Sequence, residues 1–317
     1  MRVVPQSFEV LTELDQGSML TRLEACGRIC YKSEGRITPD SAEPFVRNVL
    51  KSGHNSVAEM AVCTLRVTLD ARVMVDRFLE TLPKFLSISA LDKHVLLITG
   101  SVRAFRELYL SHPTLKMVKG ITRFLAERWP VFFFDLRPKN GWPRQDGVAV
   151  EKLPLSEVDA LPADLLAKHR HLAVRFITNR AVSHEIVRHR PCSFLQESQR
   201  YCRYDKDQFG GEVTFIKPMF FAEGSPEYAL WEEAMRRGES LYLRLLETSS
   251  PQAARTVLPN SCKTEIIVYA NLLEWFHIFR LRTSTAAEPS MREIMIPLLA
   301  EFKRLFPAVF GGLEPAA

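Results

Sequence analysis

Residues 188–201 read RHRPCSFLQESQRY and combine several cations with polar side chains. Arg188, His189 and Arg190 stand in a row, and Arg200 follows a run of amide and hydroxyl side chains. Guanidinium groups, hydroxyls and backbone N–H groups are the donors that a phosphate group requires. Apolar residues between them would place some cations at a pocket wall, but cations at a helix end are usually solvated. Spacing alone leaves the solvated helix end and the anion-binding pocket both open.

The residues around this segment alternate between strand and helix patterns. Residues 171–179 (HLAVRFITN) are typical of a strand, and residues 180–187 (RAVSHEIV) predict a helix that ends at the cations. Residues 61–69 alternate apolar and polar side chains and predict a half-buried strand. Further helices are predicted at residues 18–32, before Gly53, at 101–112, at 231–247 and from Pro251. Residues 85–89 and 94–100 fit strands or buried helical turns.

The C-terminal third of the chain predicts two more helices. Residues 261–282 (SCKTEIIVYANLLEWFHIFRLR) predict the longest helix, which would begin at Asn260 or Ser261. Ser290 and Glu293 have the spacing of a capping box for a last helix. Pro297 lies inside that helix and should kink it.

Mixed strands and helices favour an α+β fold, with a mixed sheet flanked by long helices. We expect one domain over residues 1–317, with a large insertion at about residues 70–165. Within the insertion, residues 135–162 are rich in Pro, Gly and charge and predict a loop or linker. The sequence shows neither an internal repeat nor a low-complexity tract.

Composition sets broad limits on function. The chain has 317 residues, 46% of them hydrophobic, which is enough for a sizeable core. A net charge of +5 permits an anionic partner without requiring one. The six cysteines form no CxxC pair, so we expect reduced thiols and a cytoplasmic location. We expect no signal peptide and no membrane span, because the apolar runs are too short.

Several common chemistries lack their motifs. No GxGxxG follows a strand, and there is no P-loop, so a nucleotide would not be held by a glycine-rich loop. No HExxH or CxxC pattern supports a metal, and none is predicted. Cys192 and Cys202 flank the cations, where a thiol pKa would be lowered, yet such residues are more often small buried hydrophobes.

Two further groups of residues carry polar chemistry. Arg282 ends the predicted long helix, in which Asn271 and Ile278 would share its face, as a ligand site or as a structural hydrogen-bond pair. In GHNSVAE (residues 53–59), Ser56 and Glu59 fit a capping box, which spacing alone favours over a site.

Four motifs, in the same order along the chain, resemble those of the flavin-dependent thymidylate synthases. One is RHR followed by seven residues and Ser198. The others are GHNSVAE at residues 53–59, AARTVLP at 253–259 and ANLLEWFHIFRLR at 270–282. The resemblance covers about residues 20–69 and 171–305, and residues 70–165 are much longer than in compact members of the family.

The resemblance implies an activity, cofactors and an assembly. It implies reductive C5-methylation of dUMP to dTMP, with methylenetetrahydrofolate as carbon donor, reduced FAD as hydride donor and NADPH as reductant of the flavin. It also implies a homotetramer whose active sites combine residues of more than one subunit. A related enzyme specialised for UMP, as in nucleoside-antibiotic pathways, is the alternative.

The resemblance also implies roles for individual residues. Arg282 would contact the pyrimidine and favour ionisation at N3, and His54 would lie close to the reacting centre. The residues implied at the flavin are Ser56, Glu59, Arg188, His189, Arg190, Asn271 and His277. Those implied at the nucleotide are Glu185, Arg188, Gln196, Glu197, Ser198, Gln199, Arg200, Arg255 and Arg282. A protein thiol nucleophile is then not required.

The chain departs from the family pattern at four positions. Leu273 stands where the family often has an arginine, which removes one cation from the flavin phosphates. Glu185 replaces a glutamine that touches the nucleotide. Cys30 replaces a frequent serine, and Glu288 a frequent histidine.

A non-catalytic interpretation is an RNA-binding surface. Tyr201, Tyr204 and Phe209 lie among the basic residues and could stack on bases. Acids such as Glu197 and Asp205 interrupt the basic residues, so no continuous cationic stripe forms. The sequence therefore favours an enzyme with a nucleotide substrate and neither a nucleic-acid nor a membrane partner.

Overall fold

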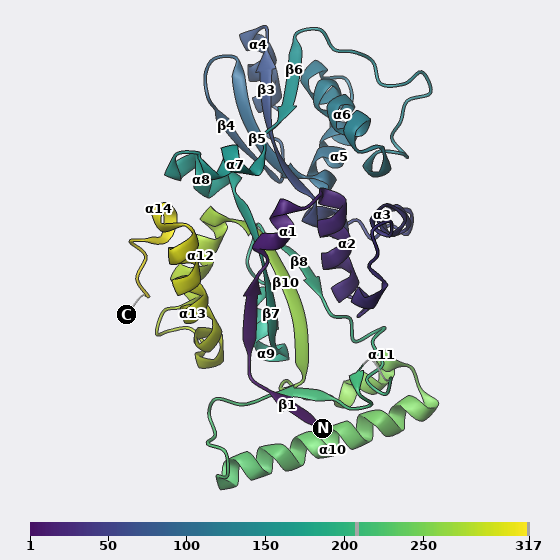
Figure 1. The fold of residues 1–317 in the computed structure, drawn as a ribbon, viewed down its shortest axis with the longest axis vertical. Coiled ribbons are helices and arrows are strands. Elements are labelled where there is room, and N and C mark those ends of the chain that lie inside the picture. Colours follow the sequence, from purple (N-terminus) through teal and green to yellow (C-terminus); the bar gives the residue numbers. More distant parts are fainter. Residues whose placement is uncertain (207–208, 316–317) are drawn as a thin grey trace.

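The computed structural model describes residues 1–206 and 209–315. Two four-stranded sheets dominate it, one in the upper and one in the lower part of Figure 1. All neighbouring strands within these two sheets are antiparallel. A third sheet pairs β1 (Arg2–Val4) in parallel with β9 (Thr214–Ile216). Antiparallel sheets with helices on their faces confirm the α+β class. The expected mixed sheet is wrong, because the parallel pair and the antiparallel pairs of the described residues lie in different sheets.

The lower sheet has the order β2-β7-β10-β8. Its strands are β2 (Ser7–Val10), β7 (His171–Asn179), β10 (Lys263–Asn271) and β8 (Ser193–Gln196). Strands β7 and β10 pair along their whole length, so their two ends lie side by side. The helices that follow them therefore start from opposite ends of this sheet.

Side-chain alternation gives the lower sheet two apolar faces. One face packs against α12 (Leu272–Arg282), α13 (Pro289–Leu305) and α14 (Pro307–Phe310), which Figure 1 shows together on one side. The opposite face contributes Ala173 and Ile267 to the core that contains α2 (Met19–Ile29). Burial on both faces makes this sheet the centre of the lower half of the molecule.

The upper sheet has the order β4-β5-β3-β6. Its strands are β4 (Leu86–Ala90), β5 (Val95–Ser101), β3 (Val62–Leu69) and β6 (Val148–Lys152). The helical elements α4 (Arg72–Leu79), α5 (Val102–Ser111), α6 (Lys116–Arg128) and η3 (Pro130–Phe132) pack on one of its faces.

Buried polar contacts join the two sheets. His169, at the end of α8 (Ala163–His169), is hydrogen-bonded through Nδ1 to Thr99 Oγ1 at 2.9 Å and through Nε2 to Ser89 Oγ at 2.9 Å. Arg170 then pairs with the buried carboxylate of Asp15 at 2.8 Å. Burial lowers the pKa of His169 to about 4, with a smaller contribution from Lys168, so the ring is neutral at pH 7.

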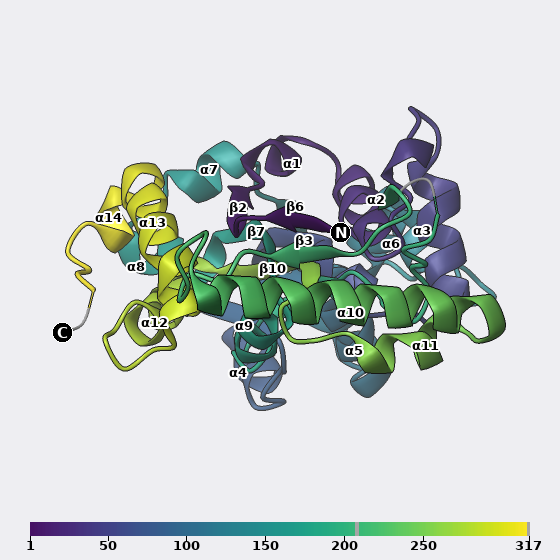
Figure 2. The same cartoon turned by 90° about the horizontal axis from the view of Figure 1, so that it is seen from below.

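The remaining elements connect or cover the sheets. Figure 2 shows α10 (Pro226–Thr248) running across the lower end of the molecule, with α11 (Pro251–Ala254) near one of its ends. The others are α1 (Thr12–Gln16), η1 (Glu34–Arg36), α3 (Ala42–Lys51), η2 (Val57–Met60), α7 (Leu155–Asp159), α9 (Arg180–Ile186) and η5 (Arg255–Val257). Among the described residues, no helix has the length and apolarity that a membrane crossing requires.

The prediction of one long helix over residues 261–282 is wrong. Its first part is strand β10, and α12 begins only at Leu272. Asn271 caps α12, because its Oδ1 accepts a hydrogen bond from the backbone N–H of Glu274 at 2.8 Å. The apolar run EIIVYA lies between two neighbouring strands and is buried on both faces, so it lacks the alternation that marks an exposed strand.

Other strand and helix predictions are largely confirmed. Strands β3 and β7 and helices α2, α3, α5, α9, α10 and α11 lie where they were expected, and residues 85–89 and 94–100 are in strands. The expected loop at residues 135–162 is wrong in part, because it contains β6 and α7. The cap of α13 is Glu288 and not Ser290, since Glu288 Oε2 accepts from the N–H of Met291 at 2.9 Å.

Candidate functional site

The loop after α9 meets the end of α12. His189 is buried, and its Nε2 accepts a hydrogen bond from Arg282 Nε at 2.8 Å. Because a guanidinium can only donate, His189 must carry its proton on Nδ1. Burial, Arg282 and His277 together lower the pKa of His189 to about 4, so the ring stays a neutral acceptor.

Glu185 completes this group, which we call the α9–α12 cluster: Glu185, His189, His277 and Arg282. Arg282 Nη1 pairs with Glu185 Oε2 at 2.6 Å, and Nη2 donates to the Glu185 carbonyl at 3.2 Å. The His277 ring lies edge-on to His189 with centroids 6.1 Å apart. Glu185 and Arg282 are 97 positions apart in the sequence, and their contact holds the Arg282 guanidinium in a fixed orientation. The Glu185 carboxylate partly balances its charge.

The two arginines of the RHR motif have surroundings that differ from those of His189. Arg188 and Arg190 are exposed on either side of the buried His189. Arg190 Nη1 donates to the carbonyls of Val187 and His189, both at 2.6 Å, and its guanidinium lies over the Phe194 ring. Exposed guanidinium groups at the rim of the α9–α12 cluster suit an anionic ligand.

His54 belongs to a second group, the Tyr31 cluster: Tyr31, His54 and Tyr201. The Tyr31 hydroxyl is hydrogen-bonded to His54 Nδ1 at 2.9 Å, and the two rings stack. Tyr201 lies 6.0 Å from Tyr31 between centroids. The backbone N–H of Ser198 donates to the carbonyl of Cys30, next to Tyr31, at 3.1 Å. The Tyr31 cluster therefore joins the GHNSVAE loop to the polar run after β8.

Glu59 forms a third group with residues that the sequence did not single out. Its Oε1 accepts from Arg103 Nη1 at 2.6 Å, and Arg103 Nε donates to Glu107 at 2.7 Å. Ser56 precedes η2, but its side chain makes no capping hydrogen bond. The capping-box interpretation of Ser56 and Glu59 is therefore wrong, because Glu59 turns toward α5.

Three predicted nucleotide residues have side chains engaged inside the protein. Gln196 Nε2 donates to Ser183 Oγ at 3.2 Å and to Thr264 Oγ1 at 3.1 Å. Glu197 accepts from Lys263 Nζ and from the Tyr204 hydroxyl, and Gln199 donates to Cys262 Sγ. These contacts fix the strand β8 and the segment that follows it.

Lys263 also takes part in a buried ionic network on the adjacent strand. Glu265 pairs with Lys32, with Lys263 at 3.1 Å and with Arg175 at 2.7 Å. Burial opposes ionisation of Glu265, but the charges of Lys263 and Lys32 outweigh it and lower its pKa to about 2. The network keeps the floor of β8 and β10 ionised over the whole neutral range.

Ser198 and Arg200 lie at the surface of the same segment. Arg200 is exposed, and its Nε donates to Gln252 of α11 at 3.1 Å. Arg255 follows α11 in η5 and is half-buried. The structure therefore brings Arg200 close to the helix that leads to Arg255.

Asn271 has a structural role in this chain. Its Oδ1 caps α12, and its Nδ2 donates to the carbonyl of Lys168 at 3.2 Å. The expectation that Asn271, Ile278 and Arg282 share a helix face is wrong, since Asn271 ends a strand.

The cysteines flanking the motif are not activated. Burial raises the pKa of the Cys192 thiol, and the neighbouring Glu274 raises it further. Burial also raises the pKa of Cys202 to about 12. The expectation of lowered thiol pKa values is wrong, because burial outweighs the nearby cations. Both thiols are protonated at pH 7 and unsuited to nucleophilic attack.

The three aromatic side chains named above differ in burial. Tyr204 is buried and packs edge-on against Phe209, with ring centroids 5.1 Å apart, in the core under α10. Only Tyr201 of the three is exposed. One basic residue of this segment, Arg203, is paired with Asp205 at 2.7 Å.

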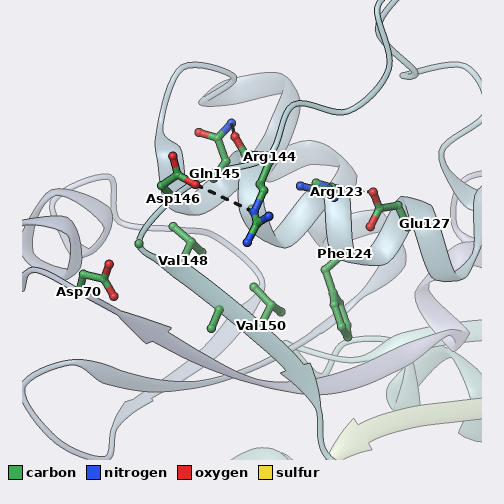
Figure 3. A pocket seen from close by; sticks show the side chains of 12 residues that line it. Asp70, Arg123, Phe124, Glu127, Arg144, Gln145, Asp146, Val148 and Val150 are labelled. Atoms are coloured by element: carbon green, nitrogen blue, oxygen red, sulfur yellow. Dashed lines mark hydrogen bonds and ion pairs between the residues drawn. The ribbon is translucent and has the colours of Figure 1, made fainter.

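A separate pocket lies between α6 and the segment that leads into β6 (Figure 3). Its volume is 350 Å³, and Arg123, Glu127, Arg144 and Asp146 are among the residues that line it. Two arginines and three carboxylates line it, the third carboxylate being that of Asp70. Arg144 Nε lies 4.0 Å from Asp146 Oδ1, and a dashed line marks this ion pair in Figure 3. This pocket holds none of the predicted site residues.

Within the described residues, the contacts thus divide the predicted site into groups. One unites Glu185, His189, His277 and Arg282, a second contains His54, and a third contains Glu59. Tyr31, Arg103 and Lys263 were missed by the sequence analysis, because each acts through a contact with a residue distant in sequence. Helical spacing does place Arg103 and Glu107 four residues apart, which was the one available signal.

Part of this chain is similar in sequence to known proteins. The family model described as "Thymidylate synthase complementing protein" matches residues 166–308. A flavin-dependent thymidylate synthase of Geobacter sulfurreducens is 34% identical over 138 residues, which are 43% of this chain and 58% of that protein. One from Pyrococcus furiosus is 35% identical over 127 residues, 40% of this chain and 51% of that protein.

The chain spans between half and two thirds of the length of the curated relatives that it matches. The matched region contains the RHR motif, strands β7 and β10, and the α12 helix that ends in Arg282. Residues 166–308 of this chain are therefore similar to the thymidylate synthase complementing proteins, and the relatives of this region are named flavin-dependent thymidylate synthases.

Proposed function

We propose that this protein is an enzyme that methylates C5 of dUMP reductively and yields dTMP. Methylenetetrahydrofolate would supply the carbon, and FAD, reduced by NADPH, the hydride. The observation that carries the proposal is the α9–α12 cluster, in which Arg282 is held by Glu185 and the buried His189 of the family motif. The names of the relatives support the same activity.

Arg282 would act on the pyrimidine. C5 of uracil is a weak nucleophile, and it becomes stronger when negative charge on the ring is stabilised. A guanidinium beside the ring, oriented in advance by two acceptors, stabilises that charge without reorganisation. His189 must remain neutral to accept from Arg282 Nε, and its lowered pKa keeps it so throughout the neutral range. Glu185 would release one N–H donor of Arg282 to the pyrimidine carbonyl when the nucleotide binds.

The donors at the rim fit a flavin dinucleotide. Arg188 and Arg190 are exposed beside the cluster, and guanidinium groups bind a diphosphate in a bidentate way. FAD, when bound, supplies the hydride chemistry, and the protein orients it and excludes water. We assign Ser56, Glu59, His277 and Asn271 to the same cofactor site, with Asn271 acting through the start of α12.

The nucleotide phosphate would be bound by residues at the surface of the polar run. Ser198, Arg200 and Arg255 carry exposed or half-exposed donors near α11. Gln196, Glu197 and Gln199 would support this segment from below through their interior contacts. His54, held by Tyr31, would stand near the reacting centre.

The assembly and location are part of the proposal. Among the described residues, no hydrogen bond or ion pair joins the α9–α12 cluster to the Tyr31 cluster or to Glu59, and we assign the protein to a homotetramer whose sites combine residues of different subunits. We assign the whole chain, residues 1–317, to one functional unit with an insertion, in the cytoplasm, and with neither nucleic acid nor membrane as partner.

Anaerobic turnover tests the proposal. Reduced flavoenzyme is mixed with methylenetetrahydrofolate and either dUMP or UMP, and flavin absorbance is followed. We expect reoxidation that requires the folate and dUMP, with a methylated nucleotide as product. Reoxidation that occurs with UMP but not with dUMP would assign the enzyme to the class specialised for UMP. If neither dUMP nor UMP supports reoxidation of the flavin, a role in C5-methylation is contradicted.

A further inference from the structure

The two large sheets have the same strand order and the same directions. Read from one edge, the lower sheet is β2-β7-β10-β8 and the upper sheet is β6-β3-β5-β4, with every pair antiparallel. In each sheet, both central strands lead into helices: β7 into α9 and β10 into α12 below, β3 into α4 and β5 into α5 above. Helices α13 and α6 then follow α12 and α5 in the chain.

The register of the central strands agrees between the sheets. Asn271 ends β10, caps the next helix and pairs with His171 at the start of β7. Ser101 ends β5, caps the next helix by accepting from the N–H of Ala104 at 3.1 Å, and pairs with Val62 at the start of β3. Matching the two caps therefore also matches the first residues of β7 and β3.

Burial follows this match along the strands. The residues that face the helices are buried in both sheets: Cys63, Leu65, Val67, Leu96 and Ile98 above, and Leu172, Val174, Phe176, Ile266 and Val268 below. The first helices after the caps bury Val102, Phe105 and Leu108 above, and Leu272, Trp275 and Ile278 below. The buried side chains at equivalent positions differ in residue type between the two sheets, but the same positions are buried in both.

The match extends to the end of each unit. Trp129 follows α6 with φ −134° and ψ 70°, and Phe306 follows α13 with φ −132° and ψ 64°. A proline comes next in both cases, and Phe133 and Phe310 are buried three residues after it. Residues 62–133 and 171–310 thus share one fold, with residues 197–262 inserted in the second where the first has a short turn.

The equivalent positions differ in chemistry. Helices α4 and α9 begin at Arg72 and Arg180, which places Pro83 on Pro191. Glu80, Thr81 and Leu82 then stand where the second unit has the RHR motif. His112 stands in the place of Arg282. The first unit therefore lacks the arginines of the RHR motif and the equivalent of Arg282.

One cation shows the opposite pattern. Arg103 lies two residues after the capping Ser101, and its equivalent in the second unit is the uncharged Leu273. Arg103 pairs with Glu59 at 2.6 Å and with Glu107 at 2.7 Å. These contacts engage Nη1 and Nε, the side chain is 41% exposed, and Nη2 has no hydrogen-bond partner among the described residues. The first unit thus presents a guanidinium beside a residue of the proposed flavin site.

We propose that residues 62–133 are a diverged second copy of the family unit, and that this copy contributes Arg103 to the cofactor site. Arg103 binds the diphosphate of FAD beside Glu59 and supplies a cation that the second unit lacks at Leu273. The pair with Glu59 fixes the guanidinium before the ligand arrives, which limits the entropy lost on binding. This assignment rests on the proposed function, because it takes Glu59 as a flavin-binding residue.

FAD binding to the flavin-free protein tests the assignment without turnover. We expect Arg103→Leu to raise the Kd for FAD about tenfold or more, the loss of one charge-assisted contact. The variant should also show a weaker dependence of Kd on salt, because one fewer cation meets the diphosphate. Arg103→Lys should recover part of the affinity, since it keeps the charge without the planar fork.

Arg123→Leu is the matched control. Arg123 lies on α6 of the same unit and forms an equivalent ion pair with Glu127 at 2.8 Å, far from Glu59 in sequence. Its loss should leave the FAD affinity unchanged. Thermal unfolding of each flavin-free variant shows whether it is folded. If Arg103→Leu is unfolded, the FAD affinity of Arg103→Lys tests the assignment instead.

Two results would overturn the assignment, and they differ. If the unaltered protein binds FAD and both Arg103 variants bind it equally well, Arg103 has no part in the site although the proposed function stands. If the unaltered protein binds no FAD, the proposed function fails and the assignment fails with it.

Discussion

The loops after α4 and α9 occupy equivalent places in the two units, yet their chemistry differs. The loop after α9 carries two exposed arginines around the buried His189. The loop after α4 exposes Leu82 and Phe85, at 78% and 72%, both with positive φ. The cores beneath them bury side chains at the same positions. Buried positions therefore define the fold of each unit, while exposed loop residues define what it binds.

The largest effect expected from this difference concerns the equivalent residues Arg282 and His112. Arg282→Ala should lower kcat about a thousandfold, because a charge-stabilising donor is lost, while flavin remains bound. His112→Ala should leave kcat unchanged, since the first unit has no α9–α12 cluster. Steady-state rates and the flavin spectrum of each variant measure both effects. A near-normal rate for Arg282→Ala would remove Arg282 from the mechanism.

The common core predicts similar losses of stability in the two units. Phe133 and Phe310 are both fully buried after equivalent prolines. Phe133→Ala and Phe310→Ala should each lower the free energy of unfolding by about 3–5 kcal/mol, through lost burial and the cavity left behind. Denaturant unfolding monitored by tryptophan fluorescence gives both values. A loss below about 1 kcal/mol at one site would show that the two positions are not equivalent.

Local patterns made the second unit predictable in part. The strand at residues 171–179 alternates, and the RHR motif follows a short amphipathic helix, so both could be located from sequence. The boundary between β10 and α12 could not be located, because a central strand buried on both faces lacks the alternation of apolar and polar residues. The contacts of Tyr31 with His54 and of Arg103 with Glu59 join distant segments, and no local pattern encodes them.

The repetition itself escaped the sequence for a related reason. Equivalent core positions hold different apolar side chains, such as Cys63 and Leu172, or Phe105 and Trp275. A core accepts such exchanges when the total volume and the pattern of burial are kept. The two caps, Ser101 and Asn271, also differ in residue type although both accept from a backbone N–H in the first turn. Only the strand register makes these residues comparable.

The stability of the protein should depend on pH through a histidine that joins the two sheets. His169 joins the two sheets and has its pKa lowered to about 4, mainly by burial. The unfolded chain would bind a proton near pH 6.5, which the folded protein does not, so stability should fall as pH drops from 6.5 towards 4. The upper limit for this residue is about 3 kcal/mol.

His169→Gln isolates that contribution. The glutamine cannot be protonated, so the slope of unfolding free energy against pH should become shallower between pH 6.5 and 4. His171 and His189 also have pKa values lowered to about 4, mainly by burial, so part of the slope should remain. An unchanged slope in His169→Gln would mean that this ring is protonated in the folded protein.

The smallest expected effect concerns the apolar loop of the first unit. Leu82 has φ 46° and is mostly exposed, so its side chain costs backbone strain and gains little burial. Leu82→Gly should raise the free energy of unfolding by about 0.5 kcal/mol, because glycine adopts positive φ without a steric clash. Leu82→Ala keeps the Cβ atom and should bring no such gain. A stabilisation of equal size in both variants would assign the effect to the lost apolar surface and not to φ.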